Sequence, residues 1–180
     1  MSALHPRTVI RKAVAALLKG KTDAGQSVYT SRVEAFGSRH LPAISVYTMD
    51  EDADTGDTSP RRYTRTPDVV VQAVFEVDED LDDAMDAMSL QIEAVLLAEP
   101  TWGGVADDSV LIKSAMYLAE NGRSEFGCLS LTFRAEYDTE PGLLDEATLD
   151  DFAVADVKYI SRTGEDPGFE DEIHLPTQAN

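Results

Sequence analysis

An Asn-Gly pair at residues 121–122 constrains the fold more than any other feature of this sequence. It separates two segments of strand composition, residues 110–120 and 125–137. Asn and Gly tolerate the positive φ angles that a tight turn between antiparallel strands requires. In the second segment apolar residues alternate with mostly polar ones, and Cys128 falls on the polar face. The pattern predicts a hairpin in an antiparallel sheet that is buried on one face only.

Three further segments have the composition of strands. Residues 28–31 and 43–48 are short β-branched and aromatic runs, with Pro42 in the connection between them. Residues 69–77, Val-Val-Val-Gln-Ala-Val-Phe-Glu-Val, have the highest β-propensity in the chain. Together with the hairpin they predict a mainly antiparallel sheet of four to six strands.

Two segments have helical periodicity. Residues 6–19 repeat apolar side chains at spacings of three and four, with Pro6 suited to the first turn and Gly20 to the end. A second stripe runs from Leu81 to Leu96, with Asp80 expected as the N-cap and Asp83 at the capping-box position. Each helix has one apolar face, so we expect an α+β fold with both helices packed on one face of the sheet.

Residues 50–65 form a charged excursion between two strands. Its acids come first and its arginines last, which indicates either an extended arm that meets a neighbouring subunit or charge balance within a loop. A calcium loop is not supported, because Thr55 and Arg61 stand where Gly and Glu would be required. The candidate subunit-interface residues are Asp50, Glu51, Asp52, Asp54, Arg61, Arg62 and Arg65.

The composition changes after Pro141. Residues 141–180 are acidic and include one segment of strand character, 152–160, followed by a stretch rich in Gly, Pro and acids. Too few apolar residues are present for this segment to build a core of its own. The sequence therefore predicts an α+β domain over residues 1–140 and an acidic C-terminal extension over residues 141–180.

The charge is strongly negative and unevenly distributed. The chain carries 34 acids and 15 bases, and 27 of the acids lie after residue 65. Such a surface repels the phosphates of DNA and RNA, so nucleic-acid binding is not expected. Solubility, adaptation to high salt, or a surface that DNA passes without adhering would each account for the acidity.

Neither a catalytic nor a cofactor-binding motif is recognisable. His5, His40 and His174 lack the spacing of metal ligands, and there is no Gly-rich phosphate loop or dinucleotide fingerprint. The single cysteine, Cys128, excludes an intrachain disulfide. We therefore expect neither an enzyme nor a bound metal or cofactor, and the sequence has no apolar run long enough for a membrane span.

Two motifs carry a resemblance to a known family. The stretch Thr-Asp-Ala-Gly-x-x-Val-Tyr-x-Ser-Arg (residues 22–32) is followed by Leu-Pro-Ala-Ile-Ser-Val-Tyr-Thr (residues 41–48) and an acidic segment. With the order helix, strands, charged excursion, strand, helix and hairpin, residues 5–138 resemble the tail terminator (minor tail) proteins of long-tailed bacteriophages, including that of phage lambda.

The resemblance implies a structural virion protein. It implies a homo-hexameric ring that caps the tail tube, ends its polymerisation and forms the surface for head–tail joining, while DNA passes through the lumen without specific binding. The tail tube protein and head–tail connector proteins would be its partners, with assembly in the host cytoplasm.

Three alternatives remain open from the sequence. A head–tail connector or completion protein of the neck would share these features. A DNA-mimic inhibitor would account for the acidic half of the chain, and a small acidic enzyme would require a pocket with perturbed carboxylates.

Overall fold

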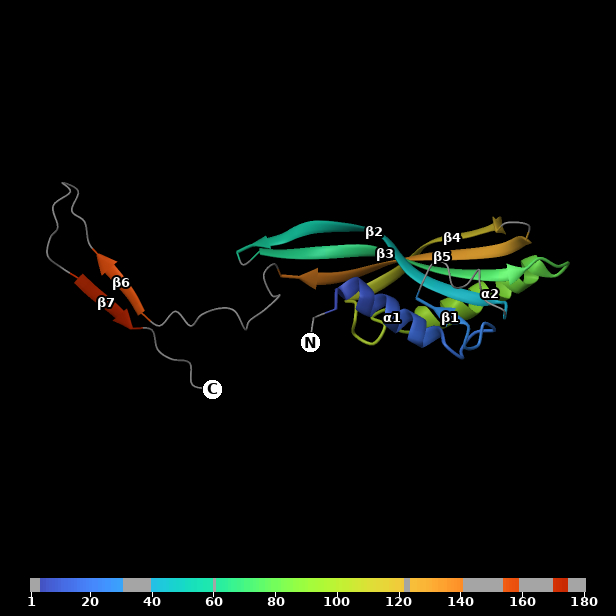
Figure 1. Cartoon of the computed structure of the whole chain (residues 1–180), viewed down its shortest axis with the longest axis horizontal. Helices are drawn as coiled ribbons and strands as arrows, with labels where there is room; N and C mark the ends of the chain where they lie inside the picture. Colours follow the sequence, from blue (N-terminus) through green and yellow to red (C-terminus); the bar gives the residue numbers. More distant parts are fainter. Residues whose placement is uncertain are drawn as a thin grey trace. The chain divides into compact units, whose positions relative to one another are not determined.

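The computed structural model describes residues 4–30, 40–59, 61–121, 124–140, 154–158 and 170–174. The chain divides into two compact units, Met1–Pro141 and Gly142–Asn180. The first unit contains one sheet and two helices, and both helices lie on the same side of the sheet (Figure 1). This arrangement confirms the predicted α+β class and the packing of both helices on one face.

Five strands form the sheet in the order β1-β2-β3-β5-β4. Their bounds are β1 Val28–Tyr29, β2 Ala43–Thr58, β3 Arg61–Glu76, β4 Asp108–Asn121 and β5 Ser124–Thr139. All neighbouring strands pair antiparallel except β1, which pairs parallel with β2 at Ile44 and Ser45. The two arms of the predicted hairpin pair as β4 and β5, while the turn residues 122–123 lie outside the described residues.

The helices begin where their sequence signals indicate, but the caps differ. Helix α1 spans Pro6–Leu18 and is capped by His5, whose Nδ1 accepts a hydrogen bond from the Arg7 backbone N–H at 3.2 Å. Helix α2 spans Leu81–Leu96 with Asp80 at the N-cap position. The Asp80 side chain makes no capping bond, so the predicted capping box is wrong. Asp78 accepts from the Asp80 backbone N–H at 3.1 Å instead.

The core lies between the helices and the sheet. Its largest buried side chain, Trp102, packs edge-on against Phe133, with ring centroids 6.1 Å apart. The indole Nε1–H donates to the Leu96 carbonyl at 3.3 Å, which satisfies one of the carbonyls left unpaired at the end of α2. Trp102 reaches this position from a tight turn in which it adopts a φ of 49° and Gly103 and Gly104 have φ of 81° and 77°.

Gly127 in β5 marks the closest approach of α2 to the sheet. A Cβ atom at this position would lie 2.3 Å from a methyl carbon of Leu81, the first residue of α2. The absence of a side chain on Gly127 therefore lets Leu81 lie directly against the strand, and Leu81 is 9 % exposed. The start of α2 is positioned by this contact.

Cys128 lies on the predicted polar face of β5, yet its side chain is buried. It does point away from the helices, together with the polar residues of β5, but it is fully buried in a second small cluster with Ala43 and Val74. Tyr29, Leu41, Ala119 and Phe126 pack partly buried around these three residues. The predicted face of Cys128 is thus correct, whereas its burial was not predicted, because alternation identifies the face of a strand and not what covers that face.

The second unit contains one short antiparallel pair. Strand β6, Val154–Lys158, pairs with β7, Glu170–His174. Strand β6 falls within the predicted strand at residues 152–160, whereas β7 was not predicted. The rest of the C-terminal extension lies outside the described residues.

Candidate functional site

The charged excursion at residues 50–65 is a β-structured arm. Strands β2 and β3 continue past the region covered by the helices and stay paired to Thr58 and Arg61, with bulges after Thr48 and Thr55. The end of β5 joins them, since Tyr137 and Thr139 pair with Arg65 and Tyr63. The arm therefore has three strands, and it projects from one end of the sheet (Figure 1).

At the base of the arm, Glu51 is the centre of a polar cluster. Its side chain is only 7 % exposed, and its carboxylate accepts hydrogen bonds from the Tyr137 hydroxyl at 2.5 Å and from Arg65 Nη1 at 3.2 Å. Arg7 Nε lies 3.8 Å from the same carboxylate. Arg65 Nε also donates to Thr139 Oγ1 at 2.9 Å. These contacts join β2 and β3, the first two strands of the arm, to β5 and α1.

The surroundings of Tyr137 change the pKa of its hydroxyl. Burial and the hydrogen bond to the Glu51 carboxylate together raise the pKa of Tyr137 well above its usual range. The hydroxyl therefore stays protonated, and remains a hydrogen-bond donor to Glu51, over the whole physiological pH range.

The other predicted interface residues lie on the exposed part of the arm. Asp50, Asp52, Asp54 and Arg61 are exposed. Arg62 is exposed as well and pairs with Glu140 at 3.1 Å and with Asp138 at 3.9 Å. Of the seven residues, Glu51 and Arg65 are brought into direct contact with each other. Sequence reasoning missed Tyr137 as their partner, because the alternation of residues 125–137 indicated only a core position for it.

A hydrogen-bonded chain crosses the face of the sheet opposite the helices. Gln72, which is 6 % exposed, donates to the Tyr117 hydroxyl at 2.5 Å and accepts from the Tyr47 hydroxyl at 3.4 Å. Burial raises the pKa of the Tyr117 hydroxyl and of the nearby Cys128 thiol. A thiol with a raised pKa forms little of the nucleophilic thiolate at neutral pH. The hydrogen-bonded chain across this face therefore has the character of a structural network.

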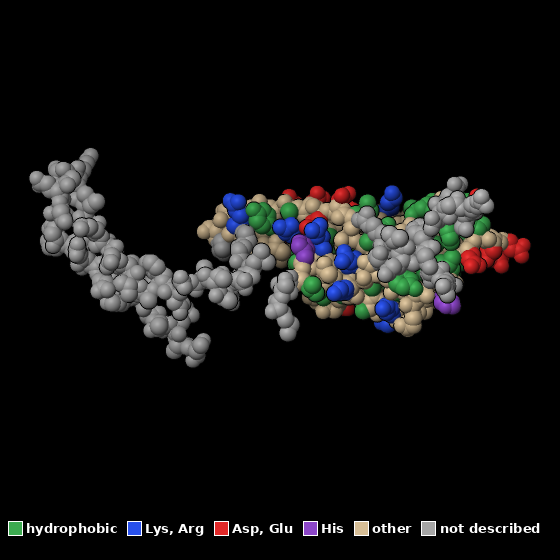
Figure 2. Space-filling view, in the orientation of Figure 1, with side chains coloured by type: hydrophobic (Ala, Val, Ile, Leu, Met, Phe, Trp, Pro, Cys, Tyr) green, Lys and Arg blue, Asp and Glu red, His purple; other side chains and the backbone are tan. Residues whose placement is uncertain are grey.

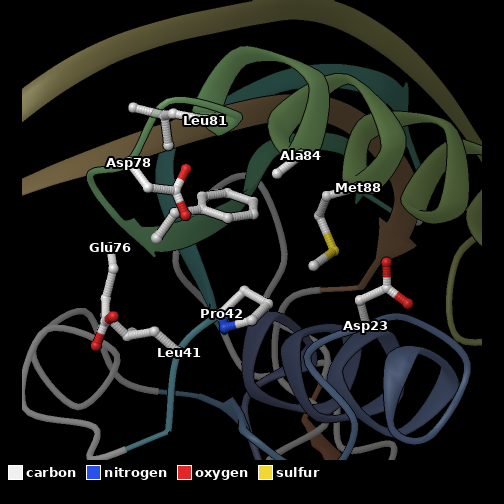
Figure 3. Close-up of a pocket in the computed structure, with 9 residues that line it drawn as sticks. Asp23, Leu41, Pro42, Glu76, Asp78, Leu81, Ala84 and Met88 are labelled. Carbon is white, nitrogen blue, oxygen red and sulfur yellow. The ribbon is translucent and has the colours of Figure 1, made fainter.

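One pocket of about 300 Å³ lies between the start of α2, the end of β3 and the turn at Pro42 (Figure 3). Leu41, Pro42, Phe75, Leu81, Ala84 and Met88 supply its apolar lining, and Asp23, Glu76 and Asp78 supply its acids. Asp23 accepts from Gln91 Nε2 at 2.7 Å, and Asp78 holds the Asp80 backbone. Two of the three carboxylates therefore have structural partners, and the described residues that line the pocket include no nucleophile–base pair.

Within the part of the chain that the structure describes, His, Cys, Asp and Glu side chains form no group suited to hold a metal ion. In the same residues, neither helix has the length and apolarity needed to cross a membrane.

The fold is a two-helix α+β domain with a projecting three-stranded arm, and comparison with protein families names the class: a structural protein of phage tails. The family described as phage minor tail protein U matches residues 5–137, well over half of the chain, and the chain belongs to this family. The resemblance found in the sequence is thereby confirmed. No curated protein matched the sequence.

Family membership locates the protein in the virion. A minor tail protein is a structural component of the phage tail and interacts there with other tail or virion proteins. The matched residues include both helices, the five-stranded sheet and the arm up to Tyr137.

Proposed function

We propose that the protein is the tail terminator, a ring of identical subunits that caps the tail tube, ends its polymerisation and provides the surface for head–tail joining. The observation that carries this proposal is the family match over residues 5–137, nearly all of the first unit. A hexamer is the expected ring, with the tail tube protein on one side and head–tail connector proteins on the other. Assembly takes place in the host cytoplasm.

The arm supports this role because it combines a stiff base with exposed charges. Glu51, Arg65 and Tyr137 hold its three strands together, so the tip is presented in a defined direction. The exposed residues Asp50, Asp52, Asp54, Arg61 and Arg62 are the part of the arm proposed to contact a neighbouring subunit. Glu51 and Arg65 act from inside the arm, by holding its shape.

The acidic composition fits a subunit that DNA passes without binding. A net charge of −19 repels phosphates. A structural role of this kind requires no catalytic or metal-binding group. A ring whose lumen is lined by Lys and Arg would contradict this part of the proposal.

Electron microscopy of particles assembled without this protein tests the function. A tail terminator predicts tubes of abnormal length, because nothing stops polymerisation. Tails of normal length that lie unattached to heads would instead identify a connector or completion protein of the neck. Complementation with the wild-type chain should restore normal tails in either case, which controls for indirect effects of the deletion.

A further inference from the structure

Helix α2 has a second apolar stripe on the side opposite its buried one. The stripe repeats at spacings of three and four and is exposed throughout: Ala87, Leu90, Ala94 and Leu97. Leu90 is 71 % exposed and Leu97, which directly follows the helix, is 45 % exposed. A single exposed Leu needs no explanation, but apolar residues at this spacing form a surface suited to packing against another element.

The two flanks of this stripe differ. On one flank Gln91 is held by its own chain, since it accepts from the Asp23 backbone N–H at 2.8 Å and donates to the Asp23 carboxylate at 2.7 Å. The other flank carries the acids Asp82, Asp86 and Glu93, which by helical geometry lie on the side of α2 away from Gln91 and α1. The free side of α2 is therefore apolar and acidic.

Helix α1 presents a complementary surface, next to the edge strand β1. A groove of about 320 Å³ lies between α1 and β1 and is bordered by Lys12 and Lys19. Small and apolar or weakly polar residues supply the rest of its lining: Ala15, Ala16, Val28, Tyr29 and Thr30. Lys and Arg side chains gather over α1, whereas acids gather at the end of the molecule where α2 begins (Figure 2). The groove is thus apolar and basic.

The spacing of the charges matches as well. Lys12 and Lys19 are seven residues apart, about 10.5 Å along a helix axis. Asp86 and Glu93 are also seven residues apart, and Leu90 lies between them. With Leu90 in the groove, this equal spacing would set one carboxylate opposite each ammonium group, and Glu93, which accepts from Ser89 Oγ at 3.0 Å, would still have acceptor positions left. The alanines Ala16, Ala87 and Ala94 let the two helices approach closely.

We propose that the exposed stripe of α2 packs into the α1–β1 groove of a second copy of this chain. The two surfaces differ in charge and lie over different strands, since α1 packs against β1 and β2 whereas α2 packs against β3 and β5. The contact is therefore head-to-tail, and each copy has one surface of each kind left for the next copy, which builds a ring when the rotation between copies closes. This inference rests on the proposed ring and names the contact that builds it.

Reversing the charges on one helix at a time tests the contact in the full-length protein. Lys12→Glu/Lys19→Glu and Asp86→Lys/Glu93→Lys each replace two attractive pairs by repulsive ones. Each variant alone should shift ring assembly, followed by analytical ultracentrifugation, to at least about tenfold higher concentration. An equimolar mixture of the two variants should assemble again, because an alternating ring restores every pair. The matched controls, Lys113→Glu and Glu125→Lys, change exposed charges away from both surfaces and should leave assembly unchanged.

Leu90→Ser tests the apolar part of the contact. Leu90 is exposed, so the substitution should leave the circular dichroism spectrum and the melting temperature unchanged while it weakens assembly. Rings that form normally in Leu90→Ser and in both charge-reversed variants would overturn this contact but leave a ring built by other surfaces. A wild-type chain that stays monomeric at every concentration would overturn it too, and tail length in particles would still decide the terminator function.

Discussion

The hydroxyl of Tyr137 donates a hydrogen bond to the carboxylate of Glu51 at 2.5 Å, across 86 residues of sequence. The bond joins β5 to β2 at the base of the arm, where Arg65 supplies the compensating charge. A carboxylate whose side chain is 7 % exposed requires such partners, because its desolvation would otherwise be costly. The pair therefore determines whether the arm keeps its shape.

Removing this hydroxyl should weaken the fold. Tyr137→Phe leaves Glu51 without one of its donors and is expected to lower the free energy of unfolding at pH 7 by about 1–3 kcal/mol, measured by urea denaturation. Tyr63→Phe is the matched control. It removes a hydroxyl from the same arm but keeps the ring that lies 5.9 Å from the Arg65 guanidinium, and it should cost less than about 0.5 kcal/mol. Equal effects of the two substitutions would contradict the role of Tyr137.

The same pair predicts a dependence on alkaline pH. Folding raises the pKa of Tyr137 above the unfolded value of about 10, so its contribution to stability is complete below that value and is lost as the pH rises through the folded pKa. The stability difference between the wild type and Tyr137→Phe should stay constant up to about pH 9 and narrow above about pH 10. Urea midpoints between pH 7 and 11 measure it. A difference that widens in this range would show that the sign is wrong.

The only thiol of the chain should be unreactive in the native state. Cys128 is fully buried, and burial raises the pKa of its thiol, so little thiolate forms at pH 8. A chromogenic disulfide reagent is expected to react with the native protein at least about 100-fold more slowly than with the protein in urea. Rapid reaction in native buffer would show that the cluster around Cys128 opens readily.

Gly127 and Leu81 should be energetically coupled. Gly127→Ala places a methyl group against the Leu81 side chain and is expected to cost about 1–3 kcal/mol. Leu81→Ala removes the clashing atoms. The double variant should therefore lose at least about 0.5 kcal/mol less stability than the sum of the losses in the two single variants. Thermal or urea unfolding of all four proteins completes the cycle. Strictly additive effects would indicate that α2 moves away from β5 without strain.

The elements of the fold were predictable because their signals are local. The apolar spacing of residues 6–19 and of Leu81 to Leu96, and the Asn-Gly pair with its alternating arms, depend on neighbours within one or two turns. The strand segments 43–48 and 69–77 were correct but too short. Their charged continuations do not look like strands in a sequence, yet pairing with each other and with β5 extends both to 16 residues.

The candidate site was predictable only in part. The charges of residues 50–65 predicted the arm. They did not predict which of the charged residues would pair with each other inside the same chain. Glu51 and Asp52 are adjacent acids in the same run, and only the paired register places Glu51 opposite Pro67, where Arg65 and Tyr137 reach it. Nothing in the sequence distinguishes the two.

The sequence by itself determined the helices, the hairpin, the acidic character and the family, since periodicity, turn chemistry and motif order are properties of short segments. Only the tertiary structure decided the parallel placement of β1 and the burial of Cys128 and of the Glu51 side chain. These features depend on which distant surfaces close against each other, and burial is a property of the closed surface and not of the residue.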